Sequence, residues 1–174
     1  DDEADAMARR CGEDYCIDFK RYTGYRGASF QPGLQSISAH ALFGGSLGAT
    51  PDGRTKQMLV SDGGVSPAQG REICGPTAAM LSVAKLNHLE ATNGALLNVK
   101  FHPSAVKGER GLENLCALTD AFFGLSAQHV QYNVVDSEVL RDAQKHPEKY
   151  GDLVVRVAGF SVLFTTLDTV LQND

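Results

Sequence analysis

The most informative stretch of this chain reads Arg156-Val157-Ala158-Gly159-Phe160-Ser161, directly after the apolar run Leu153-Val154-Val155. A short apolar run is typical of a strand, and an isolated glycine beside a strand usually marks a turn or a bulge. Glycine has no Cβ, so it adopts backbone conformations that strain every other residue. We therefore expect a strand followed by a turn at Gly159. The stretch alone leaves open whether this glycine serves a turn or a chemical step.

The composition is that of an ordinary globular protein, with 43% hydrophobic and 21% charged residues in a chain of 174. Such a chain can bury a core as one domain. A net charge of -5 provides no basic surface for nucleic acid, and no apolar run approaches the roughly 18 residues needed to span a bilayer. The acidic start has no signal-peptide pattern. We expect a cytoplasmic chain with neither nucleic acid nor membrane as a partner.

Hydrophobic spacing predicts an alternation of helices and strands. Helices are expected at 2–22, 76–88, 112–123, 137–145 and from 166 onwards with Asp168 as N-cap, and strands at 34–39, 95–101, 130–135 and 153–157. Residues 44–75 are rich in Gly, Pro, Asp and Ser and indicate a long irregular connection, which is uncommon unless it is functional or disordered. The alternation favours an α/β fold, with a sheet or barrel covered by helices.

Several further stretches accompany the glycine. They are Ala49-Thr50-Pro51-Asp52-Gly53-Arg54, Gly75-Pro76-Thr77-Ala78, Ser82-Val83-Ala84-Lys85-Leu86 and Asp142-Ala143-Gln144. In this order, and together with the pattern R-V-x-G-[YF] at 156–160, they resemble the glycyl radical enzymes. That family includes pyruvate formate-lyase, glycerol and diol dehydratases, choline lyase and arylacetate decarboxylases. The resemblance covers most of the chain. An unrelated α/β binding domain with a coincidental loop is the competing hypothesis, which the ordered match disfavours.

The resemblance implies a fold and a domain organisation. Family members form a ten-stranded α/β barrel of two half-barrels, in which a glycine loop and a cysteine loop meet. This chain resembles the C-terminal part of that barrel. Residues 1–94 would end the barrel domain, and residues 95–174 would form the glycine radical domain. The last predicted helix stops after about two turns without a C-cap signal, so we expect a piece of a longer enzyme.

The resemblance also implies the chemistry. Gly159 would store a radical on its α carbon, where delocalisation into the flanking amide nitrogen and carbonyl requires a backbone that can flatten. Arg156, Val157, Ala158, Phe160 and Ser161 would form the radical loop around it. A radical-SAM activating enzyme would remove the hydrogen, so no cofactor is bound and the glycyl radical is a post-translational modification. The full-length enzyme would be a homodimer that acts on a small molecule.

Cysteines are the second requirement of this chemistry, because a cysteine thiyl relays the radical to substrate. Cys11-Gly12-Glu13 has the Cys-x-Glu spacing of the family's cysteine loop, but Arg10 stands where glycine is expected and Cys11 precedes Gly159 by only 148 positions (159 minus 11). A short motif without its context is often a false positive. We therefore expect the thiyl cysteine outside this chain, and the chain alone to be inactive. No cysteine or histidine spacing predicts a metal site.

The substrate is less well specified. Ala158 and Phe160-Ser161 depart from the Ser-Gly-Tyr-Ala form of pyruvate formate-lyase. They resemble the dehydratase, choline-lyase and arylacetate-decarboxylase branches. We expect a lyase or dehydratase for a small hydroxylated or aminated substrate. An arylacetate decarboxylase, a formate acetyltransferase-like enzyme and a stand-alone radical repair module are the alternatives.

The predicted strand at 34–39 contains the remaining candidate residues. Successive side chains of a strand point to opposite faces, which separates Ser36 and Ser38 from Gln35. Whichever face is turned to the barrel interior could line a substrate pocket. Equally, these polar groups could be bonded to neighbouring backbone.

Overall fold

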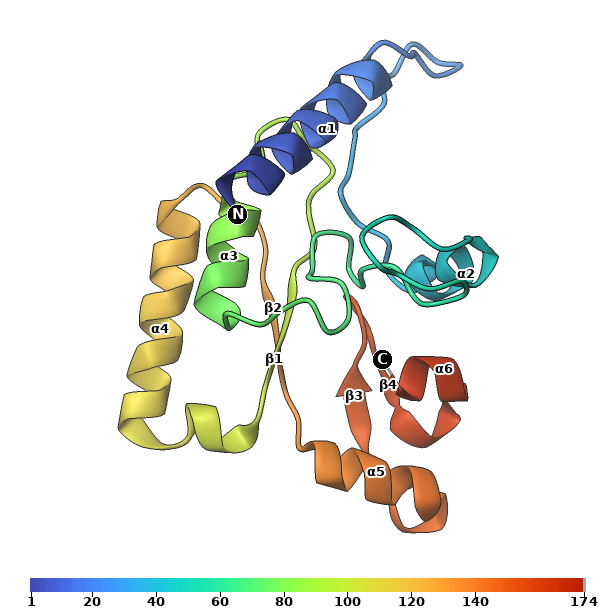
Figure 1. Cartoon of the computed structure of the whole chain (residues 1–174), viewed down its shortest axis with the longest axis vertical. Helices are drawn as coiled ribbons and strands as arrows, with labels where there is room; N and C mark the ends of the chain where they lie inside the picture. The colour runs from blue at the N-terminus through green and yellow to red at the C-terminus, as the bar shows by residue number, and fades with distance from the viewer. Residues whose placement is uncertain (174) are drawn as a thin grey trace.

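A computed structural model of the chain describes residues 1–173 and shows helices and strands alternating along the sequence (Figure 1). The elements are α1 (Asp2–Lys20), α2 (Ala39–Ser46), α3 (Pro76–Ala84), β1 (Asn98–Phe101), η1 (Pro103–Val106), α4 (Gly108–Gly124), β2 (Gln131–Val134), α5 (Ser137–Lys145), η2 (Pro147–Lys149), β3 (Val154–Arg156), β4 (Ser161–Leu163), η3 (Phe164–Thr166) and α6 (Thr169–Gln172). The predicted α/β class is confirmed.

Local sequence explains where most helices begin. Asp136 and Asp168 accept hydrogen bonds from the first free N–H groups of α5 and α6, which is the usual role of an N-cap carboxylate. Pro76 begins α3, where its missing N–H costs nothing. The predicted cap at Asp168 is thereby confirmed. The last helix was expected to run on to Asp174, which lies outside the described residues.

Two small sheets lie at the centre of the molecule. β1 and β2 are parallel neighbours, with Asn98 opposite Gln131 and Phe101 opposite Val134. β3 and β4 form an antiparallel hairpin in which Val154 pairs with Leu163. In Figure 1 the β1–β2 pair lies between α4 on one side and the β3–β4 hairpin on the other.

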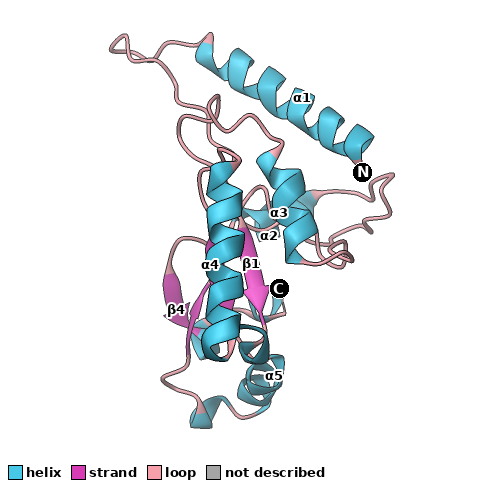
Figure 2. Cartoon of the chain, turned by 90° about the vertical axis from the view of Figure 1, so that its left-hand side faces the viewer, coloured by secondary structure: helices cyan, strands magenta, loops and turns pink. Residues whose placement is uncertain are grey.

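The two faces of the β1–β2 pair differ in chemistry. Val99 and the preceding Leu97 pack with Met80 of α3 and Phe122 of α4 in the buried core. Phe101 packs against the same cluster. Figure 2 shows α3 and α4 together over this face. Because side chains alternate along a strand, the intervening polar residues of β1 and β2 point to the opposite face, where the hairpin lies.

Charged side chains link helix α1 to the rest of the chain. Lys85 Nζ lies 2.7 Å from Asp2 Oδ1 and 2.6 Å from Asp5 Oδ2, and Lys20 pairs with Glu90 at 2.6 Å. The hydrogen bond from Lys85 lowers the pKa of Asp5 below its ordinary value. These charged pairs fix α1 across one end of the molecule, away from the β3–β4 hairpin (Figure 1).

The strand predicted at 34–39 is wrong. Leu34 makes an isolated parallel bridge to Ala95, and Ile37 makes an isolated antiparallel bridge to Gly63. Ile37 has a φ of 53°, a left-handed conformation that breaks an extended chain, and α2 begins two residues later at Ala39. The apparent alternation of polar and apolar residues therefore reflects single contacts to two loops, and no regular strand forms.

The irregular connection predicted at 44–75 is found after α2, from Leu47 to Gly75. The buried Arg54 organises part of it by donating to the carbonyls of Gly48, Thr55 and Met58. A guanidinium has five N–H donors, so one side chain can satisfy several carbonyls of a loop that has no regular partners. Within residues 1–173, no helix has the length and apolar character needed to cross a membrane.

Candidate functional site

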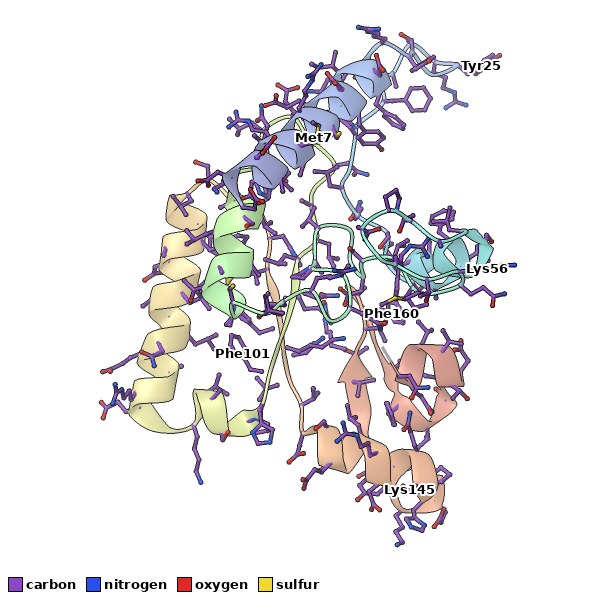
Figure 3. All side chains as sticks on the ribbon, viewed as in Figure 1. Met7, Tyr25, Lys56, Phe101, Lys145 and Phe160 are labelled. Atoms are coloured by element: carbon purple, nitrogen blue, oxygen red, sulfur yellow. The ribbon has the colours of Figure 1, made fainter. Side chains whose placement is uncertain are left out.

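The tip of the β3–β4 hairpin carries the glycine singled out in the sequence. The Val157 N–H donates to the Phe160 carbonyl at 2.9 Å, which leaves Ala158 and Gly159 as the two residues at the turn. Ala158 is buried, at 1% exposure, whereas Gly159 is exposed on this chain. Figure 3 shows Phe160 beside this turn. All six residues of the predicted radical loop, 156–161, therefore lie on the hairpin.

The backbone conformation at the tip requires glycine, although there is room for a small side chain. Gly159 has a φ of +80°, which L-residues rarely adopt. A Cβ built on Gly159 would find only Leu96 Cδ1 within 4 Å, at an ordinary 3.8 Å. The position would thus tolerate a methyl group sterically but not conformationally. Glycine serves the turn, and the open surroundings also leave its α carbon accessible.

Three buried amide side chains on β1 and β2 hold the hairpin, and we call them the amide cradle. They are Asn98, Gln131 and Asn133, exposed to only 6%, 8% and 7%. Asn98 Nδ2 and Gln131 Nε2 both donate to the Val157 carbonyl, at 3.2 and 3.3 Å. Asn133 Nδ2 donates to the Arg156 carbonyl at 3.0 Å. The hairpin is therefore fixed by neutral amides that bind its backbone.

Gln131 also contacts the glycine itself. Its Oε1 accepts a hydrogen bond from the Gly159 N–H at 2.9 Å and another from Arg156 Nε at 3.2 Å. A carbonyl oxygen has two lone pairs and can accept both. Arg156 continues around the tip, because its Nη2 donates to the Gly159 carbonyl at 3.1 Å and its Nη1 to Ser161 Oγ at 3.4 Å. Both backbone groups of Gly159 are therefore held by side chains.

The Arg156 side chain places a positive charge at the hairpin tip. Burial lowers the pKa of His129, and the nearby Arg156 guanidinium lowers that pKa further. His129 is consequently held neutral around pH 7. On the other side of the cradle, Asn98 Nδ2 donates to Asp62 Oδ2 at 3.0 Å. Arg156 is thus the cation that faces the glycine carbonyl.

The other predicted positions lie elsewhere. Gln35 Nε2 donates to the Asn93 carbonyl at 3.2 Å, and Ser36 Oγ to the Ser61 carbonyl at 3.5 Å. Ser38 precedes α2 at the N-cap position without a side-chain capping bond. Two of the three polar groups are thus bonded to backbone. A pocket-lining role for the three residues stays a prediction.

Cys11 and Glu13 lie on α1, far along the molecule from the hairpin (Figure 1). Cys11 is exposed, and Glu13 accepts hydrogen bonds from Arg9 and Asn87 at 3.0 Å each. The bond from Asn87 and that from Arg9 lower the pKa of Glu13 below its ordinary value. Among residues 1–173, no group of three or more His, Cys, Asp or Glu side chains is placed to hold a metal ion.

The amide cradle was missed in the sequence. Its signal is a polar residue at every second position of two otherwise apolar strands, in Asn98-Val99-Lys100 and Gln131-Tyr132-Asn133. This alternation marks one face of each strand as polar. It does not say that the two strands are neighbours, nor that a later hairpin covers their polar face.

Comparison with known proteins identifies the class. The family model described as "Glycine radical" matches residues 61–165, which is more than half of the chain and contains both the hairpin and the amide cradle. The chain therefore belongs to the glycine radical family. The resemblance inferred from the sequence is confirmed.

Individual relatives are enzymes of several kinds. The solved structure of the B12-independent glycerol dehydratase from Clostridium butyricum is 51% identical, with a TM-score of 0.96 over 99% of this chain and 22% of that one. Trans-4-hydroxy-L-proline dehydratase from Clostridioides difficile is 40% identical over 100% of this chain and 22% of that protein. Indoleacetate decarboxylase from Tractidigestivibacter scatoligenes is also 40% identical, over 100% of this chain and 20% of that protein. The chain thus spans only about a fifth of the length of these relatives.

Proposed function

We propose that Gly159 stores a glycyl radical and that this chain is the C-terminal, radical-bearing part of an anaerobic lyase or dehydratase. The observation that carries the proposal is the hairpin tip, in a chain of the glycine radical family. There, a glycine with a φ of +80° lies in open surroundings, with both of its backbone groups held by side chains. A glycine needed only for a turn requires no such set of contacts.

The chemical step is the loss of one hydrogen atom from the α carbon. One C–H bond of Gly159 breaks homolytically, and the hydrogen atom passes to the carbon radical that an activating enzyme generates from S-adenosylmethionine. One electron stays on the α carbon, shared with the flanking nitrogen and carbonyl. During catalysis the radical moves to a cysteine and returns. We place that cysteine outside this chain, since Cys11, the cysteine with the family's Cys-x-Glu spacing, is on α1, away from the hairpin.

The substrate class follows from the relatives. The glycerol dehydratase is the more similar of the compared enzymes, at 51% identity, and the hydroxyproline dehydratase is 40% identical. Both names describe removal of water from a small hydroxylated compound. We therefore assign this chain to a dehydratase or related lyase for a small hydroxylated or aminated substrate. Arylacetate decarboxylation is the second candidate, because the indoleacetate decarboxylase is 40% identical over the whole chain.

The fold of the whole enzyme is inferred in the same way. The parallel β1–β2 pair covered by α3 and α4 fits a segment of a larger α/β barrel, and the TM-score of 0.96 with the glycerol dehydratase supports that placement. Residues 1–94 end the barrel domain and residues 95–174 form the glycine radical domain. The full-length protein is a cytoplasmic homodimer whose transient partner is the radical-SAM activating enzyme.

The test is activity after anaerobic activation of the protein that contains this chain. Glycerol, 1,2-propanediol and trans-4-hydroxy-L-proline are supplied as substrates, and the dehydrated products are measured. Gly159→Ala should abolish turnover. Gly108→Ala is the matched control, since Gly108 is also exposed, has a φ of +73° and has nothing within 4 Å of a Cβ built on it. Full activity of Gly159→Ala would refute the proposal.

A further inference from the structure

Gly159 has two backbone groups conjugated with its α carbon, and each is bound by a different side chain. The N–H donates to Gln131 Oε1 at 2.9 Å, and the carbonyl accepts from Arg156 Nη2 at 3.1 Å. Arg156 Nε donates to the same Gln131 oxygen at 3.2 Å. One amide oxygen and one guanidinium therefore enclose the glycine from both sides and are bonded to each other.

The orientation of the Gln131 amide is fixed by its partners. Two donors, the Gly159 N–H and Arg156 Nε, face Oε1, while the Val157 carbonyl faces Nε2 at 3.3 Å. A flipped amide would place its NH2 against two donors, so the network permits one assignment. Gln131 is 8% exposed and lies in the register of the β1–β2 pair. The side chain is thus held in place before any radical forms.

The direction of these hydrogen bonds matches the charge shift that a glycyl radical requires. Delocalisation of an α-carbon radical draws electron density from the amide nitrogen and places it on the carbonyl oxygen. The N–H becomes a stronger donor, and Gln131 Oε1 is positioned to accept from it. The carbonyl oxygen becomes a stronger acceptor, and the Arg156 guanidinium is positioned to donate to it. Hydrogen bonds to a charged group are about twice as strong as neutral ones, and fixed dipoles need no reorganisation when charge develops.

We propose that Gln131 and Arg156 act as a positioning pair that polarises Gly159 and so stabilises the radical relative to the closed-shell glycine. The inference rests on the proposed function, because it assumes that Gly159 carries the radical. Its new element is the role of Gln131, a neutral residue on another strand, 28 positions before the glycine. Holding the hairpin in place is a separate task, in which Asn98 and Asn133 share.

This separation provides a matched control. Asn133 donates to the Arg156 carbonyl but contacts neither backbone group of Gly159. Asn133→Leu removes one hairpin contact and leaves both polarising bonds. Gln131→Met removes, at nearly constant volume, the acceptor of the Gly159 N–H and the bond that links Gln131 to Arg156 Nε, and it leaves the Arg156 donor to the Gly159 carbonyl in place. Gln131→Glu keeps an oxygen acceptor for the Gly159 N–H and for Arg156, replaces the donor to the Val157 carbonyl by a second oxygen, and adds a negative charge beside Arg156 when it is ionised.

The experiment compares the three variants with the wild type after anaerobic activation of the complete protein. Electron paramagnetic resonance gives the number of radicals per chain, and electron–nuclear double resonance in H2O and D2O gives the coupling of the exchangeable N–H proton of Gly159. Gln131→Met should hold less radical, by up to about tenfold, and show an altered N–H coupling. Only the amount by which this hydrogen bond strengthens when the radical forms changes the radical population, and that amount is at most of the order of one ordinary net hydrogen bond. Gln131→Glu should restore the coupling. Asn133→Leu should melt at a lower temperature with the wild-type coupling.

Two results would overturn the inference. One is a wild-type N–H coupling and radical yield in Gln131→Met. The other is an equal loss of radical in Asn133→Leu and Gln131→Met with the coupling unchanged in both, which would make Gln131 a purely structural contact. Absence of any glycyl signal in the activated wild type would instead refute the proposed function, so the two failures are distinguishable.

Discussion

Two glycines with positive φ offer a direct comparison between a structural and a chemical requirement. Gly64 has a φ of +129°, and a Cβ there would lie 2.5 Å from the Leu34 carbonyl oxygen and 2.7 Å from Gln35 Cα. Gly159 has a φ of +80° and nothing nearer than Leu96 Cδ1 at 3.8 Å. An alanine at either position is strained, but only at Gly64 does it also collide with backbone.

The expected costs differ accordingly. An alanine with left-handed backbone costs roughly 1–2 kcal/mol, which is the whole cost at Gly159 because the methyl group fits. At Gly64, overpacking adds about 1–3 kcal/mol to a comparable strain. Gly159→Ala should therefore keep the hairpin docked, with its amide protons exchanging about 5–30 times faster than in the wild type. Gly64→Ala should destabilise the loop beneath the hairpin more strongly.

The two substitutions should affect radical formation in the opposite order. Gly159→Ala should lose the glycyl radical completely despite its mild structural cost, whereas any Gly64→Ala protein that folds should still form the radical. Hydrogen exchange followed by mass spectrometry, with paramagnetic resonance on the same samples, measures both properties. If the amides of 154–163 in Gly159→Ala exchange as fast as those of an unfolded peptide, the loss of radical is a folding effect and our reasoning about Gly159 fails.

Three further outcomes are expected. Air should cleave the activated protein at Gly159 and spare the unactivated protein, because dioxygen adds to the α-carbon radical and the peroxyl product fragments the backbone; mass spectrometry of an intact chain after the radical signal is quenched would contradict this. The chain alone should show no turnover, and activity that disappears in Cys11→Ser would show that Cys11 relays the radical after all. Lys85→Met should lower the melting temperature at pH 7. Lys85 lowers the pKa of Asp5 from its ordinary 3.8, so the ion pair stabilises the fold above that pH and stops doing so as the pH falls through the lowered pKa. A difference in melting temperature between the wild type and Lys85→Met that does not shrink in acid would contradict the assignment.

Local signals predicted the parts of the fold that depend on near neighbours. Asp168 caps α6, Pro76 begins α3, and a strand ends just before Gly159, all as expected from residue types that act within a few positions. The strand predicted at 34–39 failed because its alternation arises from contacts with distant loops, while Ile37 turns the chain out of an extended conformation.

Only those residues of the site that are adjacent in sequence could be predicted. The sequence placed the glycine and its flanking residues correctly on one loop. The residues that hold this loop, above all Gln131 and Asn98, come from two strands whose pairing is not encoded locally. Polar residues inside apolar strands indicated that one face was not core. Their partners are the Val157 carbonyl and the Gly159 N–H, which reach that face only because the hairpin folds over it.

The central claim, that Gly159 stores the radical, is tested most directly by paramagnetic resonance of the activated protein with deuterium on the α carbon of glycine. Loss of one hydrogen leaves a single proton on a glycyl carbon, so the ordinary protein should give a two-line spectrum. We predict that these two lines merge into one in the deuterated protein and that Gly159→Ala gives no such signal. A two-line spectrum that survives either deuteration or the Gly159→Ala substitution would contradict the assignment.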